Sequence, residues 1–171
     1  QALIESGEFA GKENELLARA RDTGNVKWLR EYARVASENN LKREARRAYE
    51  TIVVIDPMDD IALREAGVIA FAQADYASSQ LYLEQYVNSP PGKTVDTGAY
   101  LGFFYYGELL RRQKRNEEAR PYYEGTVDHI DAQRLQSAEA LSTRAQSQIW
   151  AGETDVGLTT FANARKTYPN D

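Results

Sequence analysis

The feature that most constrains this chain is a residue pattern that repeats with a period of 34. Pro57 and Pro91 each follow a segment whose apolar residues recur three and four positions apart, and these prolines lie 34 residues apart. The two segments match at equal offsets, with Leu29, Tyr32, Ala33, Ala36, Ala45 and Tyr49 before the first proline and Leu63, Ala66, Gly67, Ala70, Ser79 and Leu83 before the second. Because such a unit is too short to bury its own apolar face, the pattern predicts stacked copies of one helical unit.

The pattern continues in the second half of the chain, with Phe103, Tyr106, Gly107, Leu110, Ala119 and Tyr123, and then with Leu141, Ala145, Phe161, Ala164 and Pro169. It resembles the tetratricopeptide repeat, in which a large apolar residue, small residues at helix contacts, an aromatic residue and a proline recur. Asp131 replaces one of the prolines, and Gly157 occupies the small position of the last second helix. The resemblance implies an all-α fold, a right-handed superhelix (solenoid) of antiparallel helix pairs.

The resemblance also implies a division of the chain. We expect an N-terminal half repeat at residues 1–25, repeat 1 at 26–59 and repeat 2 at 60–93. An insertion and repeat 3 follow at 94–133, and a second insertion and repeat 4 at 134–171. Because both ends of this arrangement are abrupt, we interpret the chain as a segment of a longer array. A complete small protein with atypical terminal repeats is the alternative.

Acidic residues at the predicted helix starts support this division. Asp59 and Asp60 follow Pro57, and Asp75 precedes a predicted second helix. Aspartate accepts a hydrogen bond from the free N–H groups of the first helical turn, so we expect these residues to act as caps.

The composition argues against several classes of function. The chain has no cysteine, which excludes thiolate chemistry and the usual structural zinc sites. His129 is the single histidine, so it has no second histidine with which to form a metal or catalytic site. The net charge of −5 gives no electrostatic reason to bind nucleic acid. We therefore predict no enzymatic activity, no metal, no cofactor and no nucleic-acid partner.

The longest apolar stretch, residues 100–110, is interrupted by Gly102, Gly107 and Glu108 and is too short to cross a bilayer. We therefore expect no direct membrane insertion. The absence of cysteine is compatible with both cytosol and periplasm, so the compartment stays open, with the periplasm slightly favoured.

In the tetratricopeptide family the first helices of successive repeats line a concave groove that commonly holds a peptide. Transferring this property by position gives as candidate partner-binding residues Arg30, Arg34, Arg64, Val68, Phe71, Leu101, Phe104, Tyr105 and Arg112. Aromatic and arginine side chains often dominate interface energies. Since the run 103–106 covers more than one helical face, at least one of its rings should be partly exposed. The alternative is that Phe104 and Tyr105 turn inward.

The resemblance implies a non-enzymatic protein–protein interaction scaffold that binds a protein or peptide segment in the concave groove. The alternative is an architectural segment of a bacterial cell-envelope machine (exopolysaccharide export, secretion or pilus assembly). Such a segment would act as a spacer or as a dimerisation element that self-associates through the ends of the array. Two basic clusters, at residues 42–47 and 111–115, are interpreted as solvated helix faces, with an anionic partner as the alternative.

Overall fold

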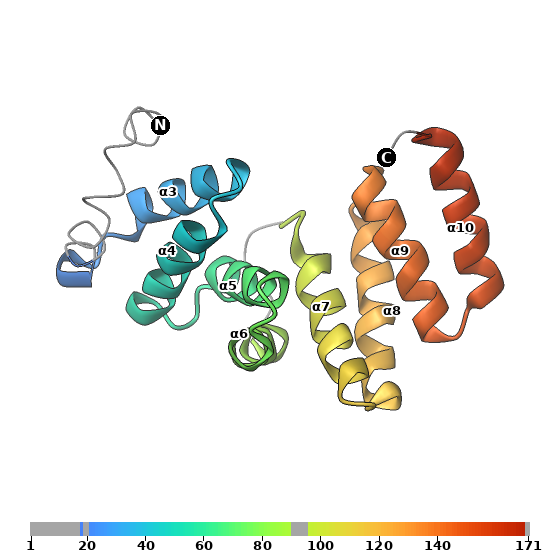
Figure 1. Cartoon of the computed structure of the whole chain (residues 1–171), viewed down its shortest axis with the longest axis horizontal. Helices are drawn as coiled ribbons and strands as arrows, with labels where there is room; N and C mark the ends of the chain where they lie inside the picture. Colours follow the sequence, from blue (N-terminus) through green and yellow to red (C-terminus); the bar gives the residue numbers. More distant parts are fainter. Residues whose placement is uncertain (1–17, 19–20, 90–95, 170–171) are drawn as a thin grey trace. The chain divides into compact units, whose positions relative to one another are not determined.

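The computed structural model in Figure 1 describes residue 18, residues 21–89 and residues 96–169. Within these ranges the chain forms helices and turns without any strand, so the prediction of an all-α fold is confirmed. By its contacts the chain divides into two compact units, residues 1–89 and residues 90–171.

Within the described residues, each unit contains two pairs of helices. The helices are α3 (Val26–Glu38), α4 (Lys42–Ile55), α5 (Asp60–Ala72), α6 (Tyr76–Asn88), α7 (Ala99–Arg112), α8 (Asn116–Ala132), α9 (Ala138–Ala151) and α10 (Thr154–Thr167). The pairs are α3 with α4 and α5 with α6 in the first unit, then α7 with α8 and α9 with α10 in the second (Figure 1). None of the helices described is long and apolar enough to span a membrane.

Each pair lies within one of the predicted repeats, whose boundaries stay a prediction. The half repeat predicted at residues 1–25 lies outside the described residues, apart from residue 18 and residues 21–25.

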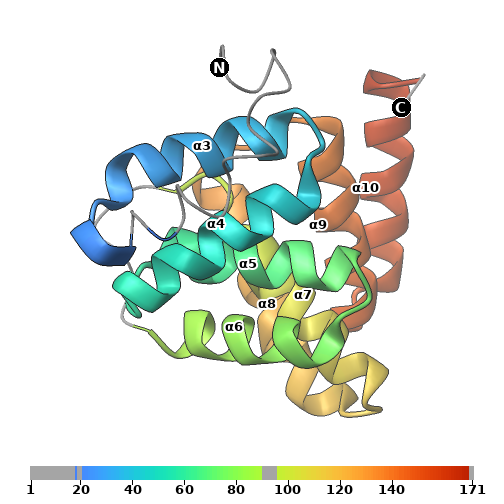
Figure 2. The same ribbon diagram turned by 60° about the vertical axis from the view of Figure 1, so that its left-hand side comes forward.

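Most described turns between helices contain a residue with left-handed backbone angles, and the turn between α4 and α5 does not. A positive φ occurs at Asn40, Ala74, Lys114, Arg134 and Gly152. After α5, the N–H of Ala74 donates to the carbonyl of Phe71 at 2.9 Å, and the N–H of Asp75 donates to the carbonyl of Ala70 at 2.9 Å. This Schellman arrangement satisfies the last carbonyls of the helix and reverses the chain direction. As a result α6 returns alongside α5 (Figure 2).

Two of the predicted caps are confirmed. Asp59 accepts a hydrogen bond from the N–H of Ala62 at 2.9 Å, and Asp75 accepts one from the N–H of Ser78 at 3.2 Å. Each carboxylate satisfies a donor that the first turn of its helix leaves unpaired. The starts of α5 and α6 are therefore fixed by side chains that the sequence identifies.

The core of the first unit is built from α3, α4 and α5. Leu29, Ile52 and Ala66 are fully buried in it, one from each helix. The contact between α5 and α6 depends on Gly67, because a Cβ there would lie 2.5 Å from Cγ of Leu83. The small residue at this position therefore allows the two backbones of the pair to approach each other closely.

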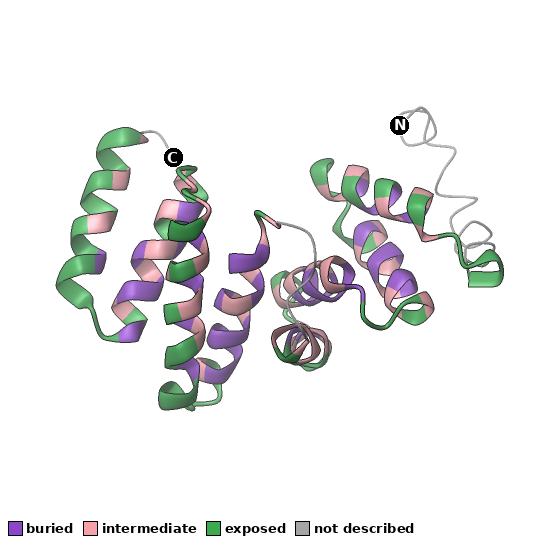
Figure 3. Ribbon diagram, turned by 180° about the vertical axis from the view of Figure 1, so that it is seen from behind, coloured by how far each residue is buried: buried purple, intermediate pink, exposed green. Residues whose placement is uncertain are grey.

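The core of the second unit joins α7, α8 and α9. Tyr100, Ile130 and Ala140 form a buried cluster with one residue from each helix. The hydroxyl of Tyr123 donates to Oε1 of Glu108 at 2.8 Å and links α8 to α7. These contacts fix three helices against each other, whereas α10 is coloured as exposed along most of its length in Figure 3.

Candidate partner-binding surfaces

The nine residues predicted to bind a partner fall on three helices. Arg30 and Arg34 lie on α3, and Arg64, Val68 and Phe71 lie on α5, so the first unit holds five of them. The remaining four lie on α7 in the second unit and are Leu101, Phe104, Tyr105 and Arg112. Five of the predicted residues thus lie in the first unit and four in the second, and their role stays a prediction.

Both arginines of α3 are engaged by carboxylates of their own unit. Arg30 donates from Nη1 to Oδ1 of Asp59 at 3.2 Å. Arg34 forms ion pairs with Glu31 at 2.6 Å and with Glu38. A ligand carboxylate would have to compete with these partners. The positive charges of Arg30 and Arg34 are therefore largely neutralised within the first unit.

On α5 the candidates are largely packed. The guanidinium of Arg64 is buried and pairs with the neighbouring Glu65 at 2.5 Å. The ring of Phe71 meets Tyr76 of α6 edge-on, with centroids 5.4 Å apart. Val68 is half-buried. Of these three side chains, only those of Val68 and Phe71 are partly exposed.

On α7 the four candidates differ in their environment. Leu101 packs against the buried cluster of the second unit. Phe104 is buried and turns toward Tyr123, with ring centroids 6.2 Å apart, which is the inward orientation left open by the sequence. Tyr105 is half-buried, and burial raises the pKa of its hydroxyl, followed in effect by the charges of Glu139 and Glu108.

Arg112 is the fourth candidate on α7, and it is exposed. Arg112 is therefore the exposed member of this group, Leu101 and Tyr105 are half-buried, and Phe104 is buried.

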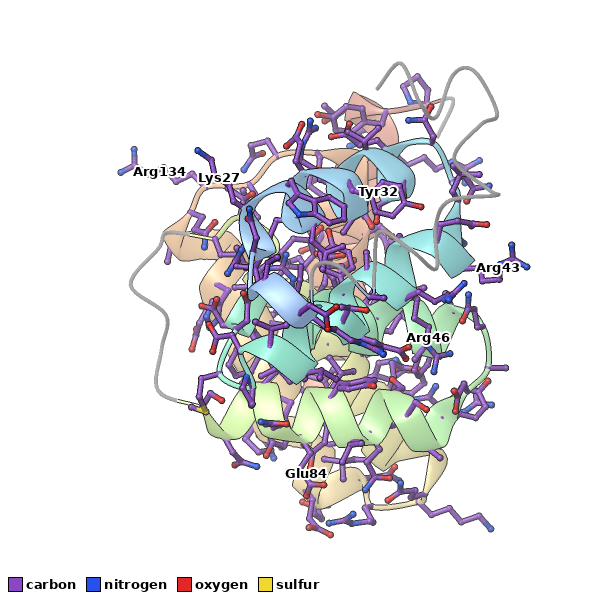
Figure 4. The ribbon with its side chains drawn as sticks, turned by 90° about the vertical axis from the view of Figure 1, so that its left-hand side faces the viewer. Lys27, Tyr32, Arg43, Arg46, Glu84 and Arg134 are labelled. Carbon is purple, nitrogen blue, oxygen red and sulfur yellow. The ribbon has the colours of Figure 1, made fainter. Side chains whose placement is uncertain are left out.

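The first basic cluster is largely neutralised. Arg46 bonds to Glu50 at 2.8 Å and to Asp75 at 2.6 Å, and so links α4 to the start of α6. Arg43 is strongly exposed and pairs with Glu44 at 3.0 Å. Figure 4 shows Arg43 and Arg46 along α4. Arg43 thus fits the interpretation of this cluster as a solvated helix face, whereas Arg46 is largely buried and links two helix pairs.

A groove between α9 and α10 is a surface that the sequence interpretation did not identify. It encloses about 800 Å³. Its lining residues are Ala138, Glu139, Ser142, Phe161, Ala162, Ala164, Arg165, Tyr168 and Pro169. The lining is apolar and aromatic, with one acid and one arginine. A groove with this lining is suited to bind the apolar face of another helix.

The groove corresponds to a surface that is covered in the preceding pair. Phe161 and Tyr168 of the α9–α10 pair lie 38 positions after Tyr123 and Ile130 of the α7–α8 pair. Tyr123 and Ile130 are each 1% exposed, and Ile130 packs against Ala140 of α9. Phe161 is 37% exposed. Helix α9 therefore covers this surface on the α7–α8 pair. No described helix covers the equivalent surface on the α9–α10 pair.

Local contacts hold the groove in shape. The hydroxyl of Tyr168 donates to the carbonyl of Gln136 at 2.6 Å, which ties the end of α10 to the start of α9. At Gly157 a Cβ would lie 2.6 Å from the carbonyl oxygen of Ala145, so α10 approaches the backbone of α9. Gly157 is the buried residue among those of α10. The groove is therefore preformed by the packing of its two walls.

Comparison with known proteins supports the fold assignment. No family model and no curated protein sequence matches the chain. A crystal structure of the MamA protein has a TM-score of 0.60 at 18% identity, covering 96% of this chain and 85% of that one. The structure of MamA from residue 41 to its end, from Desulfovibrio magneticus RS-1, has a TM-score of 0.61 at 14% identity, covering 100% and 92%.

YrrB, described as a TPR protein with an unusual peptide-binding site, has a TM-score of 0.59 at 17% identity, covering 90% of this chain and 75% of that one. The chain has a tetratricopeptide-repeat fold. At these identities the likeness concerns the fold, and it accounts for the paired helices and the small residues between them.

The single histidine of this tetratricopeptide fold is engaged by neighbouring groups. His129 sits in the last turn of α8, where Nδ1 is 2.7 Å from the carbonyl oxygen of Gly125. Its ring lies 4.7 Å from that of Phe103, between centroids. No group of three or more potential metal ligands occurs among the described residues.

Proposed function

We propose that the chain is a non-enzymatic protein-interaction module that binds a helical segment of a partner protein in the α9–α10 groove. The observation that carries the proposal is the difference between two equivalent surfaces. Helix α9 covers Ile130 on the α7–α8 pair, whereas Phe161 on the α9–α10 pair stays 37% exposed. When a partner covers an exposed aromatic side chain in a preformed groove, this burial contributes about 1–2 kcal/mol to the binding free energy.

The way in which α9 packs indicates the kind of helix that fits. Small side chains of α9 are buried in the second unit, namely Ala140, Thr143 and Ser147, spaced three and four apart. A partner helix with small residues at this spacing can approach the groove closely. Glu139 and Arg165 lie among the lining residues and would select complementary charges that fix its register.

The nine residues predicted from the family resemblance remain a second candidate surface for the same function. Among them, Arg112 on α7 is exposed, and Tyr105 on the same helix is half-buried. Arg30 and Arg34 already bind carboxylates, so their contribution to a partner would be smaller.

An architectural role in a bacterial cell-envelope machine stays a prediction, because no described contact bears on it. If the groove served that role, its occupant would be a second copy of the chain.

The proposal is tested by site-specific photocrosslinking in native cell extract. A benzophenone amino acid replaces Phe161 in the groove or, as the matched control, Val156, which is 49% exposed on the same helix and does not line the groove. We expect a discrete protein adduct from position 161 and none from position 156. Equal adducts from both positions, or none from either, would contradict a role for the groove.

The mass of the adduct separates the two alternatives. An adduct with a different protein supports the interaction module. An adduct with the mass of two copies, together with a dimer in light scattering, supports self-association.

A further inference from the structure

A notch on the second unit lies where the basic cluster at the end of α7 meets an exposed tryptophan. It encloses about 360 Å³. Its lining residues are Arg111, Lys114, Asn116, Ala119, Tyr123 and Trp150. They come from α7, α8, α9 and the turn between the first two of these helices. None of them belongs to the α9–α10 groove or to the nine predicted residues.

The floor of the notch is held by a buried polar network. Arg111 donates to both carboxylate oxygens of Glu108, at 3.1 Å and 2.7 Å, and Tyr123 donates to Oε1 at 2.8 Å. Glu108 is 7% exposed. Arg111 therefore neutralises the negative charge of Glu108, and the two hydrogen bonds orient its guanidinium group.

Arg111 also lies over the indole of Trp150, with its central carbon 4.6 Å from the ring centroid. Trp150 is 43% exposed. A large aromatic surface held in place by a cation is a preorganised contact for a ligand, since little side-chain freedom is lost when it binds.

The charge of the lining is positive. Lys114 is exposed and forms no ion pair with any other described residue, while Glu118 at the nearby start of α8 is engaged by Arg115 at 2.7 Å. Of the two basic residues in the lining, Arg111 is paired with Glu108, so Lys114 supplies the net positive charge, and no carboxylate lines the notch. The notch also contains Asn116, the first residue of α8, whose amino-terminal dipole favours negative charge.

We propose that this notch binds an acidic segment of a partner protein. An aspartate or glutamate carboxylate meets Lys114 and the outer edge of Arg111, while an adjacent apolar side chain lies on the exposed face of Trp150. The volume of the notch suits one or two side chains, so a short acidic and apolar stretch fills it. This inference gives the basic cluster at 111–115 a partner chemistry, and it goes beyond the function proposed for the α9–α10 groove.

The test uses the fluorescence of Trp150. Trp28 is replaced by phenylalanine in the full chain, which leaves Trp150 as the single tryptophan. The probe is a short peptide of alternating glutamate and leucine, acetylated and amidated so that it has no terminal carboxylate. We expect a saturable change in emission at low salt, with affinity that falls as salt rises.

Two comparisons make the result specific. The peptide with glutamine in place of glutamate should bind about tenfold more weakly or not at all, and Lys114→Glu should weaken binding by about tenfold or more. Lys42→Glu, the same charge change at an exposed position of α4, should leave affinity within about twofold, because that position is outside the notch. Phe161→Glu should do the same, which separates this site from the α9–α10 groove.

Equal binding of the two peptides, or insensitivity to Lys114→Glu in a variant of unchanged helicity, would overturn the proposal. So would the absence of any change in emission. Stronger binding of an oligothymidylate than of the acidic peptide would assign the notch to nucleic-acid phosphates instead.

Discussion

Arg30 of α3 donates a hydrogen bond to Asp59, the residue that caps α5, at 3.2 Å. The side chain of Asp59 is 1% exposed, and its carboxylate also accepts the N–H of Ala62 at 2.9 Å. One carboxylate therefore starts a helix and joins two helix pairs. This relationship gives Arg30 a role in stability that is independent of any ligand.

Replacing Arg30 should therefore cost more stability than replacing Arg34. Arg30→Ala leaves the buried carboxylate of Asp59 without its cation, and we expect a loss of about 1–3 kcal/mol in the free energy of unfolding. Arg34→Ala removes ion pairs with exposed carboxylates on its own helix, so we expect a much smaller loss. Urea denaturation of both variants checks this order, and equal losses would contradict it.

The pair of Asp75 and Arg46 predicts a dependence of stability on pH. The hydrogen bond from Arg46, followed by those from Ser78, lowers the pKa of Asp75 to about 2. Because this pKa lies below the value of about 3.9 for an unfolded chain, the stabilisation is present above pH 4 and is lost as the pH falls toward 2.

Asp75→Asn should therefore melt below the wild type at pH 7, with a difference that shrinks between pH 5 and pH 2. The melting temperatures of both proteins across this range provide the measurement. A difference that stays constant with pH would show that the ion pair does not stabilise the fold.

The stability of the second unit should depend on the hydroxyl of Tyr123. Tyr123→Phe removes one of the donors to the buried carboxylate of Glu108, and we expect a loss of about 1.5–3 kcal/mol. Tyr122→Phe is the matched control, because its ring is half-buried and makes aromatic contacts without a described hydrogen bond from its hydroxyl. Thermal unfolding distinguishes the two, and an equal effect would assign the loss to the ring surroundings.

Two glycines of second helices should respond differently to alanine. At Gly157 the added Cβ would lie 2.6 Å from the carbonyl oxygen of Ala145, and a backbone atom cannot move aside. We expect Gly157→Ala to cost about 1–3 kcal/mol. At Gly125 the nearest atom would be a ring carbon of Phe103 at 3.3 Å.

Gly125→Ala should therefore range from neutral to a gain of about 0.5 kcal/mol, because alanine favours the helix. Chemical denaturation of both variants provides the measurement. A stable Gly157→Ala variant would show that α10 can shift away from α9.

Much of the fold follows from residues that the sequence makes visible. Small residues at a fixed period mark where paired helices touch, and Gly67 against Leu83 shows why a larger residue does not fit. Asp59 and Asp75 mark helix starts because a carboxylate satisfies free N–H groups. Helix caps and close helix contacts of this kind can therefore be predicted from a single sequence.

The environment of the candidate residues was harder to predict. The spacing places Arg30 on the first helix of a pair, but it does not show that Asp59 is within reach. The groove beside Phe161 was missed because Phe161 and Tyr168 fit the repeat pattern as internal residues. Only the structure shows that no described helix covers them, since a periodic pattern specifies a position and not its neighbour.

The left-handed turns carry a consequence for engineering. Of the six described turn residues with positive φ, four have a Cβ, namely Asn40, Ala74, Lys114 and Arg134, whereas Gly24 and Gly152 lack one. A side chain in this conformation costs about 1–2 kcal/mol, least for asparagine, whereas glycine adopts it freely at some cost in unfolded-chain entropy. Ala74 and Arg134 are therefore positions at which a directed change to glycine offers a more thermostable scaffold without touching the core, the groove or the notch.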